Sequence, residues 1–148
     1  MFYPSDFKAL SGILINNLDE YKEARIRTSI SRLYYYIFLE IREIITETME
    51  IKDKKKFKNL KYKHHSLIPK ILVYIGEETD NEKIIMIGNK IKVLRKIRNE
   101  SDYNLNAIFQ IDHYISAEEK IKDIEEVITY LKQHLNSEIL IKALNELI

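Results

Sequence analysis

The sequence predicts an all-α protein, folded as an antiparallel up-and-down bundle of four main helices with short extra helices. The 148 residues include only 3 Gly and 2 Pro, too few turn residues for a many-stranded sandwich or barrel. Apolar residues also recur every three or four positions along most of the chain, which is the spacing of one helix face. A chain of this length can bury a core of its own, so we expect a single domain over residues 1–148.

Two helices are expected in the first third of the chain. Ser5 is a suitable N-cap for a helix that reaches about Asn17, with an apolar face of Phe7, Leu10, Leu14 and Leu18. A longer helix follows from about Glu20 to Met49, and its apolar arc is so wide that we expect it to be central. Its main stripe is Ile26, Ile30, Leu33, Ile37, Ile41 and Ile44, and its second stripe is Tyr34, Phe38 and Ile45.

The next segment, from Lys52 to Lys63, is rich in lysine. It carries seven lysines and one acid, with Phe57 and Tyr62 among them. This composition is typical either of a solvated, mobile loop or of a cationic surface that binds phosphates and offers rings for stacking. The contacts predicted for such a surface are Lys54, Lys55, Lys56, Lys58 and the nearby His65.

After this segment a short helix is predicted over residues 67–75. Ser66 precedes it, and Gly76 is expected to end it in a left-handed conformation. Thr79 and Glu82 then have the spacing of a capping box, which marks the start of the next helix.

That helix is expected to end at Arg98, and Gly88 in its middle is expected to allow another helix to approach closely. Residues 104–115 have no clear period and are expected to be irregular. A second capping box over Ser116–Glu119 predicts the start of the following helix. Asn136 and Ser137 then interrupt the helical spacing of apolar residues before a last amphipathic helix over residues 138–148.

Charge and composition exclude several classes of function. The net charge of +1 gives no general argument for nucleic-acid binding, and the absence of Cys excludes disulfides and thiolate metal sites. The longest apolar run, residues 33–39, is too short to span a bilayer, so we expect no membrane partner and a cytoplasmic location. His64 and His65 lack a carboxylate partner, so we expect an exposed, neutral pair, no metal and no cofactor.

Arg98 is the most informative single position. Four apolar residues precede it on one helix face: Ile84, Ile87, Ile91 and Leu94. An unpaired charge at the next position of that face would be very costly. Arg98 is therefore expected either to form an internal ion pair, with Asp102, Glu40 or Glu43, or to line a cleft that handles anions.

Three consecutive tyrosines, Tyr34, Tyr35 and Tyr36, cover most of a helix circumference, so at least one should face away from the main stripe. An exposed tyrosine suits a dimer interface, and ordinary core packing is the alternative. We assign Tyr35 and Tyr36 to such an interface. Arg32 flanks this surface and is expected either to pair with acids or to point into the cleft of Arg98.

Two segments, Arg25–Phe38 (RIRTSISRLYYYIF) and Arg98–Tyr103 (RNESDY), carry a family resemblance. The first resembles the (A/S)xSRxYYAxF helix of small HEPN proteins (higher eukaryotes and prokaryotes nucleotide-binding). The second is similar to their RxxADY signature, and Lys63–Ser66 stands where many of them carry KTHxG. The resemblance covers residues 19–135, with the motifs in the same order and at similar spacing.

The resemblance implies a four-helix bundle with a short extra helix, paired as a homodimer. Many HEPN proteins are metal-independent ribonucleases, in which an arginine clamps the phosphate and a histidine four to six residues later moves a proton. On this chain the corresponding site residues are Arg98, Asn99 and Tyr103, with Arg32 as a further RNA contact. None of the residues 103–105 is a histidine.

The sequence therefore leaves three functions open. The first is an RNA-directed protein of a toxin–antitoxin, abortive-infection or CRISPR-linked defence module, with Arg98 holding the phosphate during metal-independent cleavage. The second is a catalytically inactive HEPN domain that binds nucleotides or protein beside a partner enzyme such as a nucleotidyltransferase, and the missing histidine favours it. In that setting Tyr103 is a candidate acceptor for nucleotide addition by the partner. A purely structural helical dimer is the third option.

Overall fold

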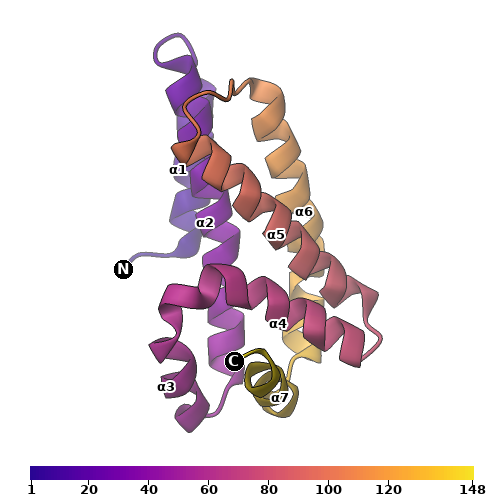
Figure 1. The fold of residues 1–148 in the computed structure, drawn as a ribbon. Helices are drawn as coiled ribbons and strands as arrows, with labels where there is room; N and C mark the ends of the chain where they lie inside the picture. Colours follow the sequence, from indigo (N-terminus) through magenta and orange to yellow (C-terminus); the bar gives the residue numbers. More distant parts are fainter. The chain divides into compact units, whose positions relative to one another are not determined.

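The computed structural model describes all residues, Met1–Ile148, and the chain is all-helical, as predicted. It contains no strand, and no helix combines the length and apolarity needed to cross a bilayer. The elements follow one another along the chain (Figure 1) as α1 (Pro4–Asn16), α2 (Lys22–Thr48), α3 (Ile51–Asn59), the 3-10 helix η1 (Lys61–Lys63), α4 (His64–Glu78), α5 (Glu82–Tyr103), α6 (Ile111–His134) and α7 (Ser137–Leu147).

The helices form two compact units. Unit 1 comprises Met1–Glu40 and Val93–Asp123, and unit 2 comprises Ile41–Lys92 and Ile124–Ile148. The three long helices α2, α5 and α6 supply residues to both units.

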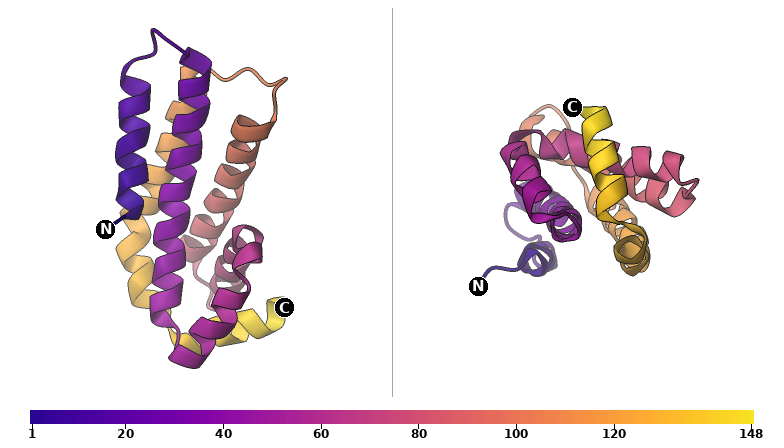
Figure 2. Two further views of the ribbon diagram at one scale, coloured as in Figure 1. Left: turned by 90° about the vertical axis from the view of Figure 1, so that its left-hand side faces the viewer. Right: turned by 90° about the horizontal axis from the view of Figure 1, so that it is seen from below.

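In unit 1, α1 runs antiparallel beside the first part of α2 (Figure 2). Ser11 and Ser29 are both buried, and each hydroxyl donates to the backbone carbonyl of the other residue, at 3.0 and 3.2 Å. These small side chains satisfy each other's hydrogen bonds and allow the two helices to pack closely. The core of the unit is formed mainly by the predicted main stripe of α2 together with residues of α5 and α6: Ile26, Ile30, Leu33, Ile37, Leu94, Ala117 and Ile121.

The connection between α5 and α6 is held by Arg27 of α2. Its guanidinium donates to the carbonyl oxygens of Ser101 at 3.1 Å and Asn104 at 2.9 Å, and also to that of Ala107. Glu23 pairs with Arg27 at 3.2 Å. Because these contacts satisfy the last carbonyls of α5, they fix the helix end that carries the Arg98–Tyr103 motif.

In unit 2, α4 packs against α7 and α5. An added Cβ on Gly88 of α5 would lie 2.9 Å from Cγ2 of Val73 and 3.0 Å from the carbonyl oxygen of Pro69, both in α4. The prediction that Gly88 allows a close helix approach is therefore confirmed. The core residues come from α4, α5, α6 and α7: Ile68, Ile71, Leu72, Ile75, Ile84, Ile87, Ile91, Ile124, Leu131, Leu140 and Leu144.

The lysine-rich segment is helical, so the expectation of a loop is wrong. Residues 51–59 form α3 and residues 61–63 form η1. Lysine itself favours helix formation. Phe57 is fully buried and anchors one side of α3 in unit 2, while the lysines of α3 are exposed or half-buried.

The boundaries of α1 differ from the prediction because a neighbouring side chain provides the cap. Tyr3, not Ser5, occupies the N-cap position, and the carboxylate of Asp6 accepts a hydrogen bond from the Tyr3 backbone N–H at 2.9 Å. Leu10 was expected on the buried face and is exposed. The packing with α2 instead buries Ser11.

Gly76 does not end α4 but lies inside it. An added Cβ there would lie 2.8 Å from the backbone nitrogen of Ile85, so the glycine serves a close approach rather than a left-handed stop. The left-handed residue is Asp80, with φ of 50°. Asn81, not Thr79, caps α5, because its side-chain oxygen accepts a backbone N–H of the first turn at 3.3 Å.

The predicted end of α5 and start of α6 are also wrong. α5 continues past Arg98 to Tyr103, and α6 begins at Ile111 instead of Ser116. The backbone N–H of Gln110 donates to Nδ1 of His113 at 2.9 Å, a side-chain contact at the helix start that replaces the expected capping box. The α7 prediction is confirmed, with its N-terminal amides capped by the preceding asparagine.

Candidate functional site

Arg98 lies on α5 in unit 1 and is only 6% exposed. Its Nη1 is 3.6 Å from Oδ2 of Asp102, one helical turn later. The guanidinium also lies over the rings of Tyr34 and Tyr35, 5.2 Å from each centroid. Of the two expectations for Arg98, the structure contains the internal ion pair. Its Nε is buried without a hydrogen-bond partner.

Arg32 joins the same group of side chains. It donates to the hydroxyl of Ser31 at 3.2 Å, and Ser31 donates to Oδ2 of Asp102, also at 3.2 Å. The Arg32 guanidinium lies 5.2 Å from the centroid of the Tyr35 ring. The two arginines therefore share one aromatic ring and are linked through a hydroxyl and a carboxylate. We call Arg98, Asp102, Ser31, Arg32 and Tyr35 the arginine cluster.

The environment of this cluster keeps its tyrosine neighbour neutral. Burial raises the pKa of Tyr34 to about 12, although the charges of Arg98 and Arg95 oppose the shift. Tyr34 therefore stays protonated, and the carboxylate of Asp102 is the anion paired with Arg98. Cation–π contacts with the two rings provide further compensation for the buried guanidinium.

The other two residues of the predicted catalytic set lie near the end of α5. Asn99 is half-buried, and Tyr103 is 72% exposed. His113 is the one histidine of unit 1, and its ring contacts Phe109 and the backbone of Gln110. The predicted set of Arg98, Asn99 and Tyr103 contains no histidine and therefore lacks a group suited to proton transfer.

The predicted interface tyrosines have different environments. Tyr36 is buried, and the ammonium group of Lys8 lies 5.5 Å from its ring centroid. The ring packs inside unit 1, so the expectation that Tyr36 presents an exposed surface is wrong. Tyr35 is half-buried and belongs to the arginine cluster.

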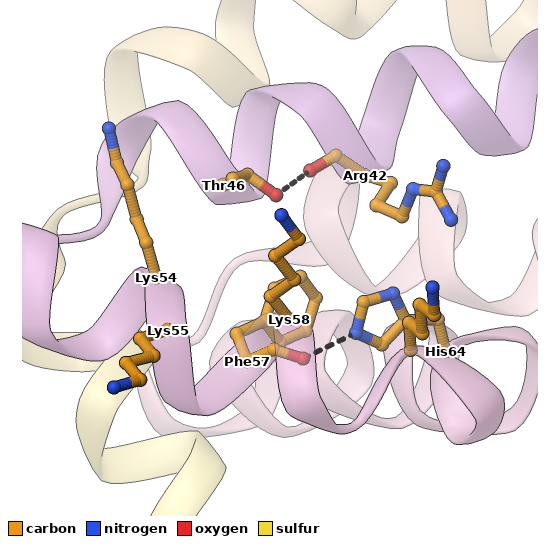
Figure 3. A pocket seen from close by; sticks show the side chains of 8 residues that line it. Arg42, Thr46, Lys54, Lys55, Phe57, Lys58 and His64 are labelled. Atoms are coloured by element: carbon orange, nitrogen blue, oxygen red, sulfur yellow. Dashed lines mark hydrogen bonds between the residues drawn. The ribbon is translucent and has the colours of Figure 1, made fainter.

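A second candidate site is a cavity of about 580 Å³ in unit 2 (Figure 3). We call it the basic cavity, because six of its eight lining residues are basic and none is acidic. It is lined by Arg42 and Thr46 of α2, Lys54, Lys55, Phe57 and Lys58 of α3, Lys61 of η1 and His64 of α4.

His64 forms part of the cavity wall and is only 3% exposed, so the expectation of an exposed histidine pair is wrong. Its Nε2 is 2.8 Å from the carbonyl oxygen of Phe57, and its ring stacks on the Phe57 ring at 4.0 Å. Nδ1 is buried without a hydrogen-bond partner. Burial lowers the pKa of His64, and the charge of Arg42 adds to this effect, so the ring is neutral near pH 7.

The predicted nucleic-acid contacts are only partly brought together. Lys54, Lys55 and Lys58 line the cavity, but Lys56 donates to the side chain of Asn145 in α7 at 2.9 Å. His65 follows His64 in α4 and is not a lining residue, and Arg32 belongs to the arginine cluster in unit 1.

Sequence reasoning missed Arg42, Lys61 and His64 as lining residues. Arg42 lies on a helix that precedes the lysine-rich segment, and only the folding of α3 and η1 brings that segment to it. The one available signal was the position of His64 immediately after the lysines.

Comparison with known proteins gives a relationship at the level of the whole chain. It is 32% identical over 136 residues to uncharacterized protein MJ0992 of Methanocaldococcus jannaschii, covering 88% of this chain and 77% of MJ0992. The chain belongs to the MJ0992 family.

A second relative of this MJ0992-family chain is uncharacterized protein MJ0628 of the same organism. It is 33% identical over 112 residues, which cover 72% of this chain and 66% of MJ0628. No family model matches the chain. No solved structure matches it either. The functional argument for this MJ0992-family chain therefore depends on the geometry of its two candidate sites.

Proposed function

We propose that this chain is a HEPN-like, RNA-directed protein that binds RNA through its basic cavity and does not cleave it. The observation that carries this proposal is the gathering of six basic side chains around one cavity without an acid. Contacts between cations and phosphates dominate the affinity of proteins for nucleic acids. The ring of Tyr62 in η1 is 73% exposed, and such a ring beside a basic surface can stack on an unpaired base.

The state of Arg98 supports the proposed absence of cleavage. Its guanidinium is buried and already paired with Asp102, so a phosphate would have to displace that carboxylate. The predicted set also lacks a histidine to transfer the proton of a 2′-hydroxyl. Both features favour the inactive HEPN domain over the ribonuclease.

RNA binding is tested by the salt dependence of affinity for a single-stranded oligoribonucleotide. The double substitution Lys54→Gln/Lys58→Gln removes two cavity cations and should reduce the slope of log K against log salt by about 0.7 for each lost contact. Lys56→Gln is the matched control, since this lysine of α3 contacts Asn145, and it should leave the slope unchanged. The proposal is contradicted if the double variant and Lys56→Gln lose RNA affinity equally, or if the original chain binds no RNA at low salt.

The lack of cleavage is tested by incubating labelled RNA with the protein in EDTA, alongside Arg98→Ala. We expect no product that depends on Arg98. Cleavage by the original chain that disappears in Arg98→Ala would overturn this part of the proposal and establish the metal-independent ribonuclease instead.

The resemblance also supports a cytoplasmic homodimer in a defence or toxin–antitoxin module. Light scattering in solution tests the dimer, and the neighbouring gene tests the module. A nucleotidyltransferase partner would find Tyr103 accessible, because this residue is 72% exposed. Mass spectrometry after incubation with the partner and nucleotide should then show a nucleotide adduct that Tyr103→Phe lacks.

A further inference from the structure

The charge around the basic cavity exceeds what an internal backbone phosphate of RNA would balance. Five arginine and lysine side chains line it: Arg42, Lys54, Lys55, Lys58 and Lys61. A phosphodiester carries one negative charge, whereas a phosphate monoester carries about −1.5 to −2 near pH 7. The volume of about 580 Å³ falls within the range of roughly 300–1,000 Å³ of small-molecule sites. The cavity therefore suits a doubly charged phosphate with part of its nucleoside.

The uncharged polar groups of the cavity wall already form hydrogen bonds within the protein, with one exception. The hydroxyl of Thr46 donates to the carbonyl oxygen of Arg42 at 2.7 Å, and the carbonyl oxygen of Phe57 accepts from His64. The exception is Nδ1 of His64, which is buried without a partner. It lies on the side of the ring toward Arg42, away from the carbonyl of Phe57 (Figure 3). A buried polar atom without a hydrogen-bond partner lowers the stability of the fold. This points to a ligand that forms the missing hydrogen bond.

The tautomer of His64 determines what that ligand must offer. Nε2–H donates to the Phe57 carbonyl, so Nδ1 of the neutral ring carries a lone pair. The charged residues lining the cavity around it are Arg42 from α2, Lys54, Lys55 and Lys58 from α3 and Lys61 from η1, and all are cations. Among these cations, Arg42 opposes protonation of the ring in the empty cavity. A dianion among them reverses the local field and favours the protonated ring.

We propose that the basic cavity binds a phosphate monoester, and that protonated His64 donates a hydrogen bond from Nδ1 to the phosphate. The bound group is either the terminal phosphate of an RNA or that of a free mononucleotide. Only the RNA source rests on the proposed RNA-binding function.

This coupling has a defined sign. In the empty protein the pKa of His64 is lowered by burial and by Arg42, and a bound dianion raises it. Binding therefore takes up a proton in the interval between the two values. Affinity falls as the pH rises through the pKa of the complex.

The direct test follows the ring resonances of His64 by NMR during a pH titration, with and without inorganic sulfate. Sulfate stays dianionic across this range, so the probe itself does not titrate. We expect sulfate to raise the pKa of His64 and to leave the resonances of His65 in place. An unchanged titration of His64 at saturating sulfate would overturn the proposal.

The test with RNA compares one oligoribonucleotide with a 5′-phosphate, a 3′-phosphate or neither. At pH 6.5 we expect a terminal phosphate to strengthen binding about tenfold, the scale of one charged hydrogen bond, and at pH 8 the advantage should shrink. His64→Gln should abolish the advantage, because its amide can keep the bond to Phe57 but carries no titrating nitrogen. His65→Gln, the matched control, should keep it. An advantage retained in His64→Gln would overturn the proposal, and so would an equal affinity of all three RNAs together with a His64 titration that sulfate leaves unchanged.

Competition with AMP distinguishes the two sources. If AMP binds as tightly as the phosphorylated RNA that it displaces, the cavity is a mononucleotide site. If AMP binds more weakly than that RNA, the cavity recognises an RNA end. Either result supports the monoester site. If no RNA binds while sulfate still shifts His64, the proposed function fails and this inference stands. If RNA binds with no preference for a terminal phosphate and sulfate leaves His64 unchanged, the inference fails and the proposed function stands.

Discussion

Asp102 stabilises unit 1 because it is the carboxylate paired with the buried guanidinium of Arg98. It also accepts a hydrogen bond from Ser31. The side chain of Asp102 is 25% exposed, so water offsets part of the effect of removing it. The arginine, by contrast, has little access to water and depends on this partner.

We therefore expect Asp102→Ala to lower the free energy of unfolding by about 3 kcal/mol, the lower end of the range for breaking a buried pair. Chemical denaturation measures this change. Glu100→Ala removes an exposed acid from the same helix and should change stability by less than about 0.5 kcal/mol. Similar effects of both substitutions would show that Arg98 does not depend on its ion pair.

His64 gives the stability of the empty protein a pH dependence. Its folded-state pKa is lowered from 6.5, first by burial and then by Arg42. The unfolded chain therefore binds more protons in the interval between the lowered value and 6.5. The contribution of His64 to stability must then rise with pH across this interval and be lost as the pH falls through the lowered pKa of the folded state.

We expect the free energy of unfolding to decrease below pH 6.5 and the decrease to be smaller in His64→Gln. Denaturation curves at a series of pH values, recorded without phosphate or sulfate, provide the measurement. A profile of His64→Gln identical to that of the original chain would contradict the assignment.

At the scale of elements, close helix packing makes one glycine essential and leaves another dispensable. Gly88 of α5 faces α4, and a Cβ there would lie 2.9 Å from Val73. A Cβ on Gly12 of α1 would have no neighbour within 4 Å. The same substitution should therefore have opposite effects at the two positions.

Gly88→Ala should destabilise the protein by about 1–3 kcal/mol, the typical result of overpacking. Gly12→Ala should stabilise it by about 0.5–1 kcal/mol, because alanine favours the helix. Thermal or chemical denaturation distinguishes them. A neutral or stabilising Gly88→Ala would mean that α4 and α5 are not in close contact at this point.

The two aromatic residues of the lysine-rich segment have separate roles. Phe57 is fully buried and anchors α3, whereas the ring of Tyr62 is exposed. Phe57→Ala should cost about 3–5 kcal/mol and accelerate amide exchange over residues 51–59. Tyr62→Ala should leave stability nearly unchanged and weaken RNA binding by about 1–3 kcal/mol if a base stacks on the ring. The reverse pattern would contradict both assignments.

How much of these elements could be predicted depends on where their stabilising contacts lie. The apolar stripes of α2 follow the helical period, so burial from Ile26 to Ile45 was predictable from spacing alone. The helical state of α3 was not, because its apolar anchor is the single residue Phe57. Helix starts were misplaced where a contact such as that of Gln110 with His113 replaced the local capping motif.

At the scale of the whole molecule, the two candidate sites illustrate different limits of sequence reasoning. The arginine cluster was predictable in outline, because Arg98 and Asp102 are one turn apart and Arg32 lies in a recognisable motif. The basic cavity was only half predictable. Its lysines are adjacent in sequence, but Arg42 and His64 come from other helices and meet the lysines only after folding.

The chain carries Arg98 at the end of α5, and none of the residues 103–105 is a histidine. In unit 1 the arginine is held by its own carboxylate. In unit 2 cations gather around a cavity with one unpartnered histidine nitrogen. Binding, rather than bond cleavage, is the function that these two arrangements support.

RNA binding by Lys54→Gln/Lys58→Gln, measured against Lys56→Gln over a salt series, tests this central claim most directly. The proposed function predicts a weaker affinity and a shallower salt slope in the double variant, with Lys56→Gln behaving as the original chain. The claim is contradicted if the double variant binds RNA as the original chain does.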